Sequence, residues 1–256
     1  MEKHLTDKSI IEIISGHNGT SLFNEEGVAI EYEFLAKNIK KIGKQLSSID
    51  SKNNKICALV LPNGIDMAIS FLALANYVTV SPLNPSYTRE EFLFFLEDLD
   101  CDFIIADDNA SNALIEAAKL LKIKLFYIES YSPESELLIK SLPTSSISLP
   151  HQNKTDDICL ILHTSGTTSR PKQVQLSYMN IISSALNIAH VIKLEKKDKG
   201  MNIMPLFHIH GLIASLLSSI VTGSSLVCTS GFNALTFYGS LRTVSYTHLT
   251  LPTSYA

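Results

Sequence analysis

Cysteine is scarce in this sequence, and tryptophan is absent. The four cysteines lie far apart, at Cys57, Cys101, Cys159 and Cys228. Because none of them forms a C-x-x-C pair, the sequence offers neither a zinc ribbon nor a dithiol redox motif. The four thiols are therefore expected to be buried and reduced.

Clusters of positive charge are also missing. The chain has 21 Lys and Arg against 25 Asp and Glu, a formal net charge of -4, and these residues are spread along the sequence. Without a basic cluster that carries interleaved aromatic residues, no nucleic-acid partner is expected. Glu2, Asp7 and Glu12 interrupt the apolar run that a secretory signal peptide needs, so a reducing compartment is expected.

No apolar run is long and uninterrupted enough to predict an integral membrane span. Two stretches come close, residues 67–82 and residues 211–228, whereas a spanning helix needs about 20 apolar residues. Asn76 interrupts the first and several serines interrupt the second, so each is predicted to be a buried helix followed by a buried strand. Membrane association through the second stretch is the alternative, which carbonate extraction would test.

A hydrophobic fraction of 45% with 18% charged residues is typical of a chain with a packed core. Strand-like runs alternate with segments of helical spacing, and Thr88 followed by Glu91 predicts a capping box. This order predicts a largely parallel sheet with helices on both faces. Strands are expected at 55–61, 77–80, 101–106, 124–128, 157–163, 200–204 and 225–229, and helices at 64–76, 88–99, 109–121, 177–191 and 210–222. Residues 129–154 are predicted to be a polar surface connection that could contain one short helix.

Hydroxyl side chains gather at residues 164–172 (TSGTTSRPK), which follow one predicted strand and precede a predicted helix. A glycine without a side chain, several hydroxyls and one lysine are groups that can approach and bind a polyphosphate. The segment is not a Walker A loop, because Pro171 stands where that motif has its second glycine. An ordinary Ser/Thr-rich turn has a similar composition and remains the alternative.

The longer string TSGTTSRPKQV resembles the phosphate-binding signature of the adenylate-forming superfamily, which includes acyl-CoA synthetases, adenylation domains of peptide synthetases and beetle luciferases. Downstream, residues 204–212 (MPLFHIHGL) are similar to the next motif of these enzymes, and upstream, residues 73–91 resemble their strand and proline-rich turn. With residues 232–238 (FNALTFY), the chain most resembles the oxalate-CoA ligase and short-to-medium-chain acyl-CoA ligase group. The resemblance covers roughly residues 10–242.

The resemblance implies an α/β fold, the amino-terminal part of the adenylate-forming enzyme fold, with mostly parallel sheets flanked by helices in αβαβα layers and the second sheet incomplete. Residues 1–242 are expected to be a partial AMP-binding domain. Residues 243–256, which depart from the family pattern, are expected to be a non-native tail. The carboxy-terminal domain with its catalytic lysine is expected to be absent, and the compartment stays open between cytoplasm and peroxisome.

The activity that the resemblance implies has two steps. A small-molecule carboxylic acid attacks the α-phosphorus of ATP, pyrophosphate bound to Mg2+ leaves, and coenzyme A then captures the acyl-adenylate. His208 is expected to be the catalytic-site histidine, beside the carboxylate. The residues expected to bind the β- and γ-phosphates are Thr164, Ser165, Gly166, Thr167, Thr168 and Lys172. A short form that binds a nucleotide or a partner without catalysis is the alternative function.

Lys172 and the histidines at positions 163, 208 and 210 each have a simpler interpretation. Lys172 could be a solvated surface charge. His208 and His210 could share one face of an extended segment and bind a metal, although no third ligand is predicted and His210 is expected to be structural. His163 is expected to pack rather than to react.

Two positions depart from the family signature, because Ser169 and Gln173 stand where glycine is usual. Serine at the first of these positions also occurs in the oxalate-CoA ligase group. If the second position requires positive φ or a close backbone approach, Gln173 costs about 1 kcal/mol or more. Weaker nucleotide binding is then expected.

Overall fold

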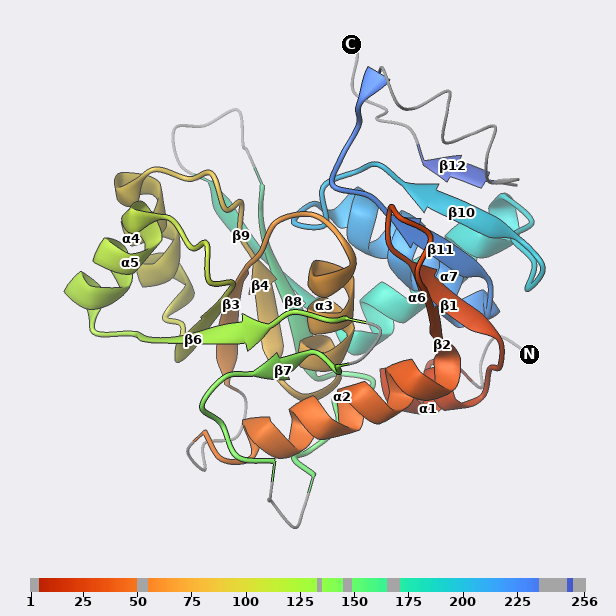
Figure 1. The fold of residues 1–256 in the computed structure, drawn as a ribbon, viewed down its shortest axis with the longest axis horizontal. Coiled ribbons are helices and arrows are strands. Elements are labelled where there is room, and N and C mark those ends of the chain that lie inside the picture. The colour runs from red at the N-terminus through yellow and green to blue at the C-terminus, as the bar shows by residue number, and fades with distance from the viewer. Residues whose placement is uncertain are drawn as a thin grey trace. The chain divides into compact units, whose positions relative to one another are not determined.

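A computed structural model gives the fold of the chain (Figure 1). It describes residues 5–49, 55–132, 135–144, 149–164 and 171–234, and the backbone of residues 248–250. The chain divides into two compact units. Unit 1 consists of Met1–Ala36, Asn63–Ala68 and Met179–Ala256, and unit 2 of Lys37–Pro62 and Ile69–Tyr178.

Unit 2 is built on a seven-stranded sheet with the order β7-β6-β5-β3-β4-β8-β9. Its inner neighbours are parallel, whereas β7 and β9 run antiparallel at the two edges. The predicted largely parallel sheet is therefore confirmed. The strands are β3 (Ile56–Val60), β4 (Thr79–Pro82), β5 (Phe103–Ala106), β6 (Lys124–Glu129), β7 (Leu138–Ile139), β8 (Ile158–Thr164) and β9 (Lys172–Ser177).

Helices cover both faces of this sheet. The helices α4 (Arg89–Leu99) and α5 (Asn112–Leu121) pack on one face, where Phe92 and Leu114 meet Ile104 of β5 in one buried cluster. On β5 the next residue, Ile105, points to the opposite face, because successive strand side chains alternate. There it lies in a cluster with Ile42 of α2 (Tyr32–Leu46) and Leu74 of α3 (Ile65–Tyr77).

The predicted capping box at the start of α4 is confirmed. The Thr88 hydroxyl accepts the Glu91 amide at 3.3 Å, and Glu91 Oε2 accepts the Thr88 amide at 2.7 Å. Together the two bonds satisfy amide groups that the first helical turn cannot satisfy itself. At the other end, Asp100 closes the helix with φ 48°.

Two segments of unit 2 differ from the prediction. The hydroxyl-rich loop does not lead directly into a helix: residues Lys172–Ser177 form β9, and α6 (Tyr178–Val191) begins only after it. The period-two alternation of residues 173–176 (QVQL) was the signal for this strand. The connection at residues 129–154 is not purely a surface segment, because it contains β7 and the buried Asn153, whose Nδ2 donates to the Ala75 and Val78 carbonyls at 3.0 and 2.9 Å.

Unit 1 contains a five-stranded sheet with the order β12-β10-β11-β1-β2. All neighbours are parallel except β1 and β2. The short helix α1 (Ile10–Ser15) starts at a second capping box, formed by Ser9 and Glu12, which was not predicted. The strands are β1 (Thr20–Phe23), β2 (Ala29–Glu31), β10 (Lys199–Asn202), β11 (Ser225–Cys228) and β12 (His248–Thr250).

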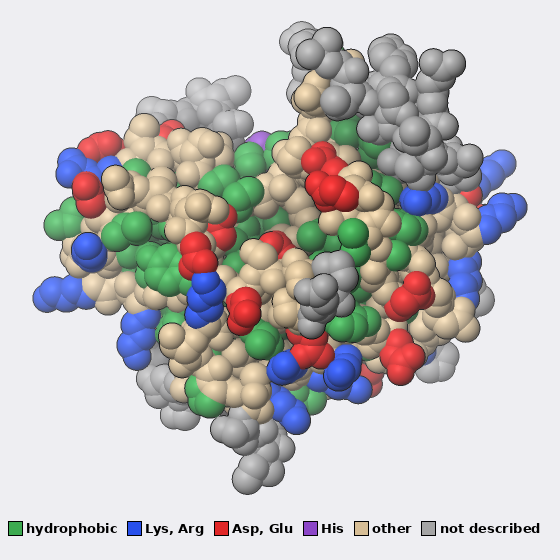
Figure 2. Space-filling view, in the orientation of Figure 1, with side chains coloured by type: hydrophobic (Ala, Val, Ile, Leu, Met, Phe, Trp, Pro, Cys, Tyr) green, Lys and Arg blue, Asp and Glu red, His purple; other side chains and the backbone are tan. Residues whose placement is uncertain are grey.

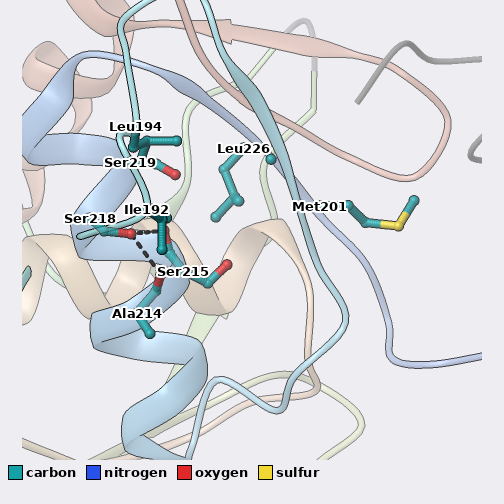
Figure 3. A pocket seen from close by; sticks show the side chains of 9 residues that line it. Ile192, Leu194, Met201, Ala214, Ser215, Ser218, Ser219 and Leu226 are labelled. Carbon is teal, nitrogen blue, oxygen red and sulfur yellow. Dashed lines mark hydrogen bonds between the residues drawn. The ribbon is translucent and has the colours of Figure 1, made fainter. Parts of the chain in front are cut away.

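The helix predicted at residues 210–222 has two parts, a π-helix η2 (His210–Leu217) and an α-helix α7 (Ser218–Thr222). At their junction the Ser218 hydroxyl donates to the Ala214 and Ser215 carbonyls at 2.7 and 3.1 Å (Figure 3). The wide π-helical turn leaves a small cavity against Leu226 of β11. The Ser215 hydroxyl borders this cavity, is buried, and forms no hydrogen bond with the described residues.

The cysteines and the long apolar segments lie where their composition predicted, in the interior. All four cysteines are free and buried, as predicted. No helix in the described ranges is long and apolar enough to cross a bilayer. On the face drawn in Figure 2, acidic and basic side chains are intermixed.

Candidate functional site

The two ends of the hydroxyl-rich segment, Thr164 and Lys172, lie on the antiparallel strands β8 and β9 of unit 2, called the β8–β9 hairpin here. Thr164, the last residue of β8, and Lys172, the first residue of β9, are paired directly across the two strands. The Thr164 hydroxyl donates to the Lys172 carbonyl in a long bond of 3.5 Å. Ser165, Gly166, Thr167 and Thr168 lie outside the described residues. The structure therefore brings the two ends of the predicted phosphate loop together.

The position of this hairpin suits a ligand site. Strand β8 runs parallel to β4, so residue 164 lies at the carboxyl edge of the parallel strands. In open α/β sheets, ligands bind at that edge. Both Thr164 and Lys172 are exposed there. Lys172 forms no ion pair with the described residues, so its charge is available to an anion.

The base of the hairpin is attached to the last turn of α4. His163 Nε2 lies 3.0 Å from Asp98 Oδ2. Gln173 pairs with His163 across the two strands, and its side-chain Nε2 donates to the Asp98 backbone carbonyl. The His163 ring is 6% exposed and packs edge-on against Phe95 at 4.7 Å between ring centroids. The predicted packing role of His163 is confirmed. The hydrogen bond from His163 holds the pKa of Asp98 below its usual value, and the bond to Gln173 adds to this effect.

Gln173 does not have the backbone conformation that would demand glycine. It lies within the extended strand β9 and is not among the described residues with positive φ. Its side chain instead contributes a hydrogen bond to α4. Of the two conditions on which weaker nucleotide binding was expected, positive φ is not met at Gln173. The other condition, a close backbone approach at this position, stays a prediction.

His208 lies in unit 1, on a turn that follows β10. Its amide donates to the Pro205 carbonyl at 3.1 Å, and its own carbonyl accepts the Leu212 amide at 3.2 Å. The imidazole lies 4.6 Å from the Phe207 ring, between centroids. It keeps an exposed surface, yet the protein atoms around it exclude enough water to lower its pKa.

The metal-binding alternative for His208 and His210 required an extended segment, but His208 lies in a turn and His210 begins the π-helix η2, where a helix was predicted to start. The two rings therefore do not occupy alternate positions of a strand, and the geometry proposed for a shared metal is lost. In the described part of the chain, no three His, Cys, Asp or Glu side chains gather in a way that could hold a metal ion.

Two residues that sequence reasoning missed hold the His208 turn. Asn63 Oδ1 accepts the Leu206 amide at 2.8 Å. Gly211 allows the turn to close on the start of η2, because a Cβ at this position would lie only 2.6 Å from the Pro205 carbonyl oxygen. The glycine was visible in the motif, but Asn63 is 143 residues from Leu206 in sequence and had no local signal.

Comparison with known proteins decides the family. A family model described as AMP-binding enzyme matches residues 14–256. The chain belongs to the AMP-binding enzyme family. This confirms the resemblance on which the site prediction was based.

Curated proteins with similar sequences carry CoA ligase names. An oxalate–CoA ligase from Arabidopsis thaliana is 37% identical over 211 residues, which are 80% of this chain and 41% of that protein. An oxalate–CoA ligase from Saccharomyces cerevisiae is 35% identical over 71% of this chain and 38% of that protein. Both support the predicted likeness to the oxalate-CoA ligase group. The chain spans about two fifths of the length of these relatives.

Solved structures of other proteins share the fold. ATP-bound MatB from Rhodopseudomonas palustris superimposes with a TM-score of 0.80 over 94% of this chain and 48% of that chain, at 18% identity. The o-succinylbenzoate CoA synthetase from Bacillus subtilis in complex with AMP gives a TM-score of 0.79 over 94% of this chain and 60% of that chain, at 22% identity. The predicted fold class, mostly parallel sheets flanked by helices, is confirmed.

Proposed function

We propose that this chain supplies the phosphate-binding loop and part of the acyl site of an ATP-dependent acid–CoA ligase. The observation that carries the proposal is the β8–β9 hairpin, which pairs Thr164 with Lys172, the two ends of the hydroxyl-rich segment. The CoA ligase names of its relatives support the same reaction class. The site residues, the substrates and the division into a partial domain with a tail are all part of this proposal.

The proposed reaction activates a carboxylic acid and then forms a thioester. A carboxylate oxygen attacks the α-phosphorus of ATP, a P–O bond forms, and the bond to pyrophosphate breaks. The thiolate of coenzyme A then attacks the acyl carbon and AMP leaves. Activation is needed because a free carboxylate is a poor electrophile, whereas the adenylate has a good leaving group.

The loop would act on the leaving group. Backbone amides around Gly166 and the hydroxyls of Thr164, Ser165, Thr167 and Thr168 are suited to donate to the β- and γ-phosphate oxygens. Lys172 would add a charge-assisted hydrogen bond, which is stronger than a neutral one. Because negative charge grows on pyrophosphate as the P–O bond breaks, donors fixed at these oxygens would lower the barrier.

His208 would act at the other substrate. Partial burial lowers its pKa, so the ring is neutral at pH 7 and carries one N–H. That N–H can donate to a carboxylate oxygen and orient it for attack without losing the proton. A neutral ring also avoids pairing so strongly with the carboxylate that the oxygen becomes a weaker nucleophile.

Magnesium and coenzyme A remain predictions of the family likeness. The described residues offer no group of three carboxylate, thiol or imidazole ligands for a metal ion. No step is therefore assigned to Mg2+ on this chain. ATP and its phosphates are the ligand to which the described residues are suited.

The experiment that tests the proposal is carboxylate-dependent exchange of labelled pyrophosphate into ATP. It would be run with the 256-residue chain and with the same chain joined to the remaining part of the Arabidopsis oxalate–CoA ligase. Oxalate, o-succinylbenzoate and a short fatty acid would serve as carboxylates. Exchange by the joined protein supports the proposal. ATP binding without exchange in either protein would support the non-catalytic alternative, and absence of ATP binding in both would reject the nucleotide site.

A further inference from the structure

We propose that Asn63 is a positioning residue for the turn that carries His208. The inference rests on the proposed function, because it assigns to Asn63 the task of holding the acyl-side histidine. Asn63 itself touches no reacting atom in this proposal. It acts through the backbone of residues 204–211, which are called the histidine turn below.

The contacts of Asn63 join two loops that are distant in sequence. Its side-chain oxygen accepts the Leu206 amide at 2.8 Å, and its side-chain nitrogen donates to the Thr229 carbonyl at 2.7 Å. Leu206 is fully buried and belongs to the histidine turn after β10, whereas Thr229 directly follows β11. Strands β10 and β11 are parallel neighbours. One amide group therefore bridges the carboxyl ends of two adjacent strands.

The bridge continues through two further buried polar side chains. The Thr229 hydroxyl donates to the Asn202 carbonyl at 2.7 Å. The Asn202 side chain in turn donates to the Met204 carbonyl at 3.0 Å and accepts the Met204 amide at 3.2 Å. Asn202 and Thr229 are both buried. Asn63, Asn202 and Thr229 thus form a network that fixes the start of the histidine turn from two sides.

Asparagine is suited to this bridge for a chemical reason. Its planar amide presents one acceptor and one donor at a fixed spacing, and here each meets a backbone group of the opposite kind. Aspartate would keep the acceptor for Leu206 but place a second carboxylate oxygen beside the Thr229 carbonyl. Alanine would leave the Leu206 amide and the Thr229 carbonyl without their partner, and unsatisfied buried groups are costly.

The Leu206 bond holds the middle of the histidine turn, whereas Asn202 holds its start at Met204. Leu206 lies two residues before His208, and the turn closes on η2 at Gly211, where the Pro205 carbonyl leaves no room for a Cβ. If the Leu206 bond is lost, the turn can move away from the protein atoms that now surround the imidazole. His208 would then be more hydrated and less well oriented. A misplacement of about 1 Å can reduce catalysis by roughly a hundredfold.

The test compares Asn63→Ala and Asn63→Asp with a matched control, Asn153→Ala. Asn153 lies in unit 2 and also makes two side-chain bonds to backbone carbonyls, those of Ala75 and Val78. The first measurement is the pH titration of the His208 Cε1–Hε1 signal by NMR in the 256-residue chain. Loss of that signal in a His208→Gln variant assigns it.

The second measurement is pyrophosphate exchange by the joined protein, with separate KM values for ATP and for the carboxylate. In Asn63→Ala we expect the pKa of His208 to rise toward its ordinary value of 6.5. We also expect the carboxylate KM to rise roughly tenfold or more, with the ATP KM unchanged. Asn63→Asp should give smaller changes in the same direction. Asn153→Ala should lower the melting temperature without moving either quantity.

These readouts separate the two proposals. A folded Asn63→Ala with an unchanged His208 titration and an unchanged carboxylate KM would overturn the positioning role. If Asn63→Ala does not fold, Asn63→Asp decides, because it breaks the bond to the Thr229 carbonyl. An unchanged His208 titration and an unchanged carboxylate KM in that variant would overturn the role of the bridge. If the His208 titration moves but the unmodified joined protein shows no exchange, the positioning role holds and the proposed enzyme activity fails.

Discussion

His163 and Asp98 are joined by a hydrogen bond of 3.0 Å that attaches the base of the β8–β9 hairpin to the end of α4. The two residues are 65 positions apart in sequence. Because His163 directly precedes Thr164, this contact fixes the point from which the hydroxyl-rich loop departs. The first prediction concerns the carboxylate of this pair.

Asp98→Asn should reduce the loss of stability at acid pH. The pKa of Asp98 is lowered in the folded chain, so the unfolded chain binds more protons once the pH falls near the ordinary value of about 3.9. The contribution of Asp98 is therefore complete above that pH and is lost as the pH falls through the lower, folded value. The Asp98 side chain is 39% exposed, so the effect is small.

Urea unfolding at pH 7 and at pH 3 would measure how much stability the Asp98 carboxylate contributes at each pH. The asparagine variant should lose less free energy of unfolding between the two pH values than the parent chain. Glu129→Gln, which removes an exposed carboxylate at the end of β6, is the control and should leave the difference unchanged. An equal difference in all three proteins would refute the prediction.

Lys172→Ala should weaken ATP binding. A hydrogen bond to a charged group contributes about 1.5–3 kcal/mol, which corresponds to a roughly 10- to 100-fold loss of affinity. Isothermal titration with ATP would measure the change. Lys119→Ala, at an exposed lysine of α5, removes the same charge away from the hairpin and should have little effect. If the two variants bind ATP equally well, Lys172 is an ordinary surface charge.

Gln173→Gly should lower stability rather than improve nucleotide binding. The residue is extended and its side chain bonds to Asp98, so glycine removes one hydrogen bond and adds backbone freedom. The expected loss is about 1–2 kcal/mol. Gln175→Gly, two positions further along β9, adds the same freedom without removing a side-chain hydrogen bond to a described residue and should cost less. Tighter ATP binding by Gln173→Gly, measured by titration, would instead restore the idea that this position needs glycine.

Ser215→Ala and Ser218→Ala should change stability in opposite directions. The buried Ser215 hydroxyl forms no bond with the described residues, so its removal should raise the free energy of unfolding by about 1 kcal/mol. The Ser218 hydroxyl bonds to the Ala214 and Ser215 carbonyls (Figure 3), so its removal should lower the free energy of unfolding by a similar amount. Chemical unfolding of both variants gives the comparison. A destabilised Ser215→Ala would mean that this hydroxyl has a partner in solution.

Local signals were sufficient for much of the fold. The apolar runs predicted β3, β5, β6, β8 and β11 nearly in place, because buried parallel strands have continuous apolar sequences. The capping box at Thr88 and Glu91 fixed the start of α4 in the same way, since both partners lie within one turn. The edge strand β9 was missed because its alternation covers only a few residues. The division of the 210–222 helix into η2 and α7 had no sequence signal.

The sequence by itself determined the family, the alternation of most strands and helices after residue 55 and the composition of the phosphate loop, because each depends on residues that are close together in the chain. Only the tertiary structure decided that Asp98 and Gln173 attach the hairpin to α4, and that Asn63 reaches Leu206 across 143 residues. Such contacts depend on how strands are ordered in a sheet. A single polar residue outside a motif carries no local mark of its distant partner, so these anchors appear only once the chain has folded.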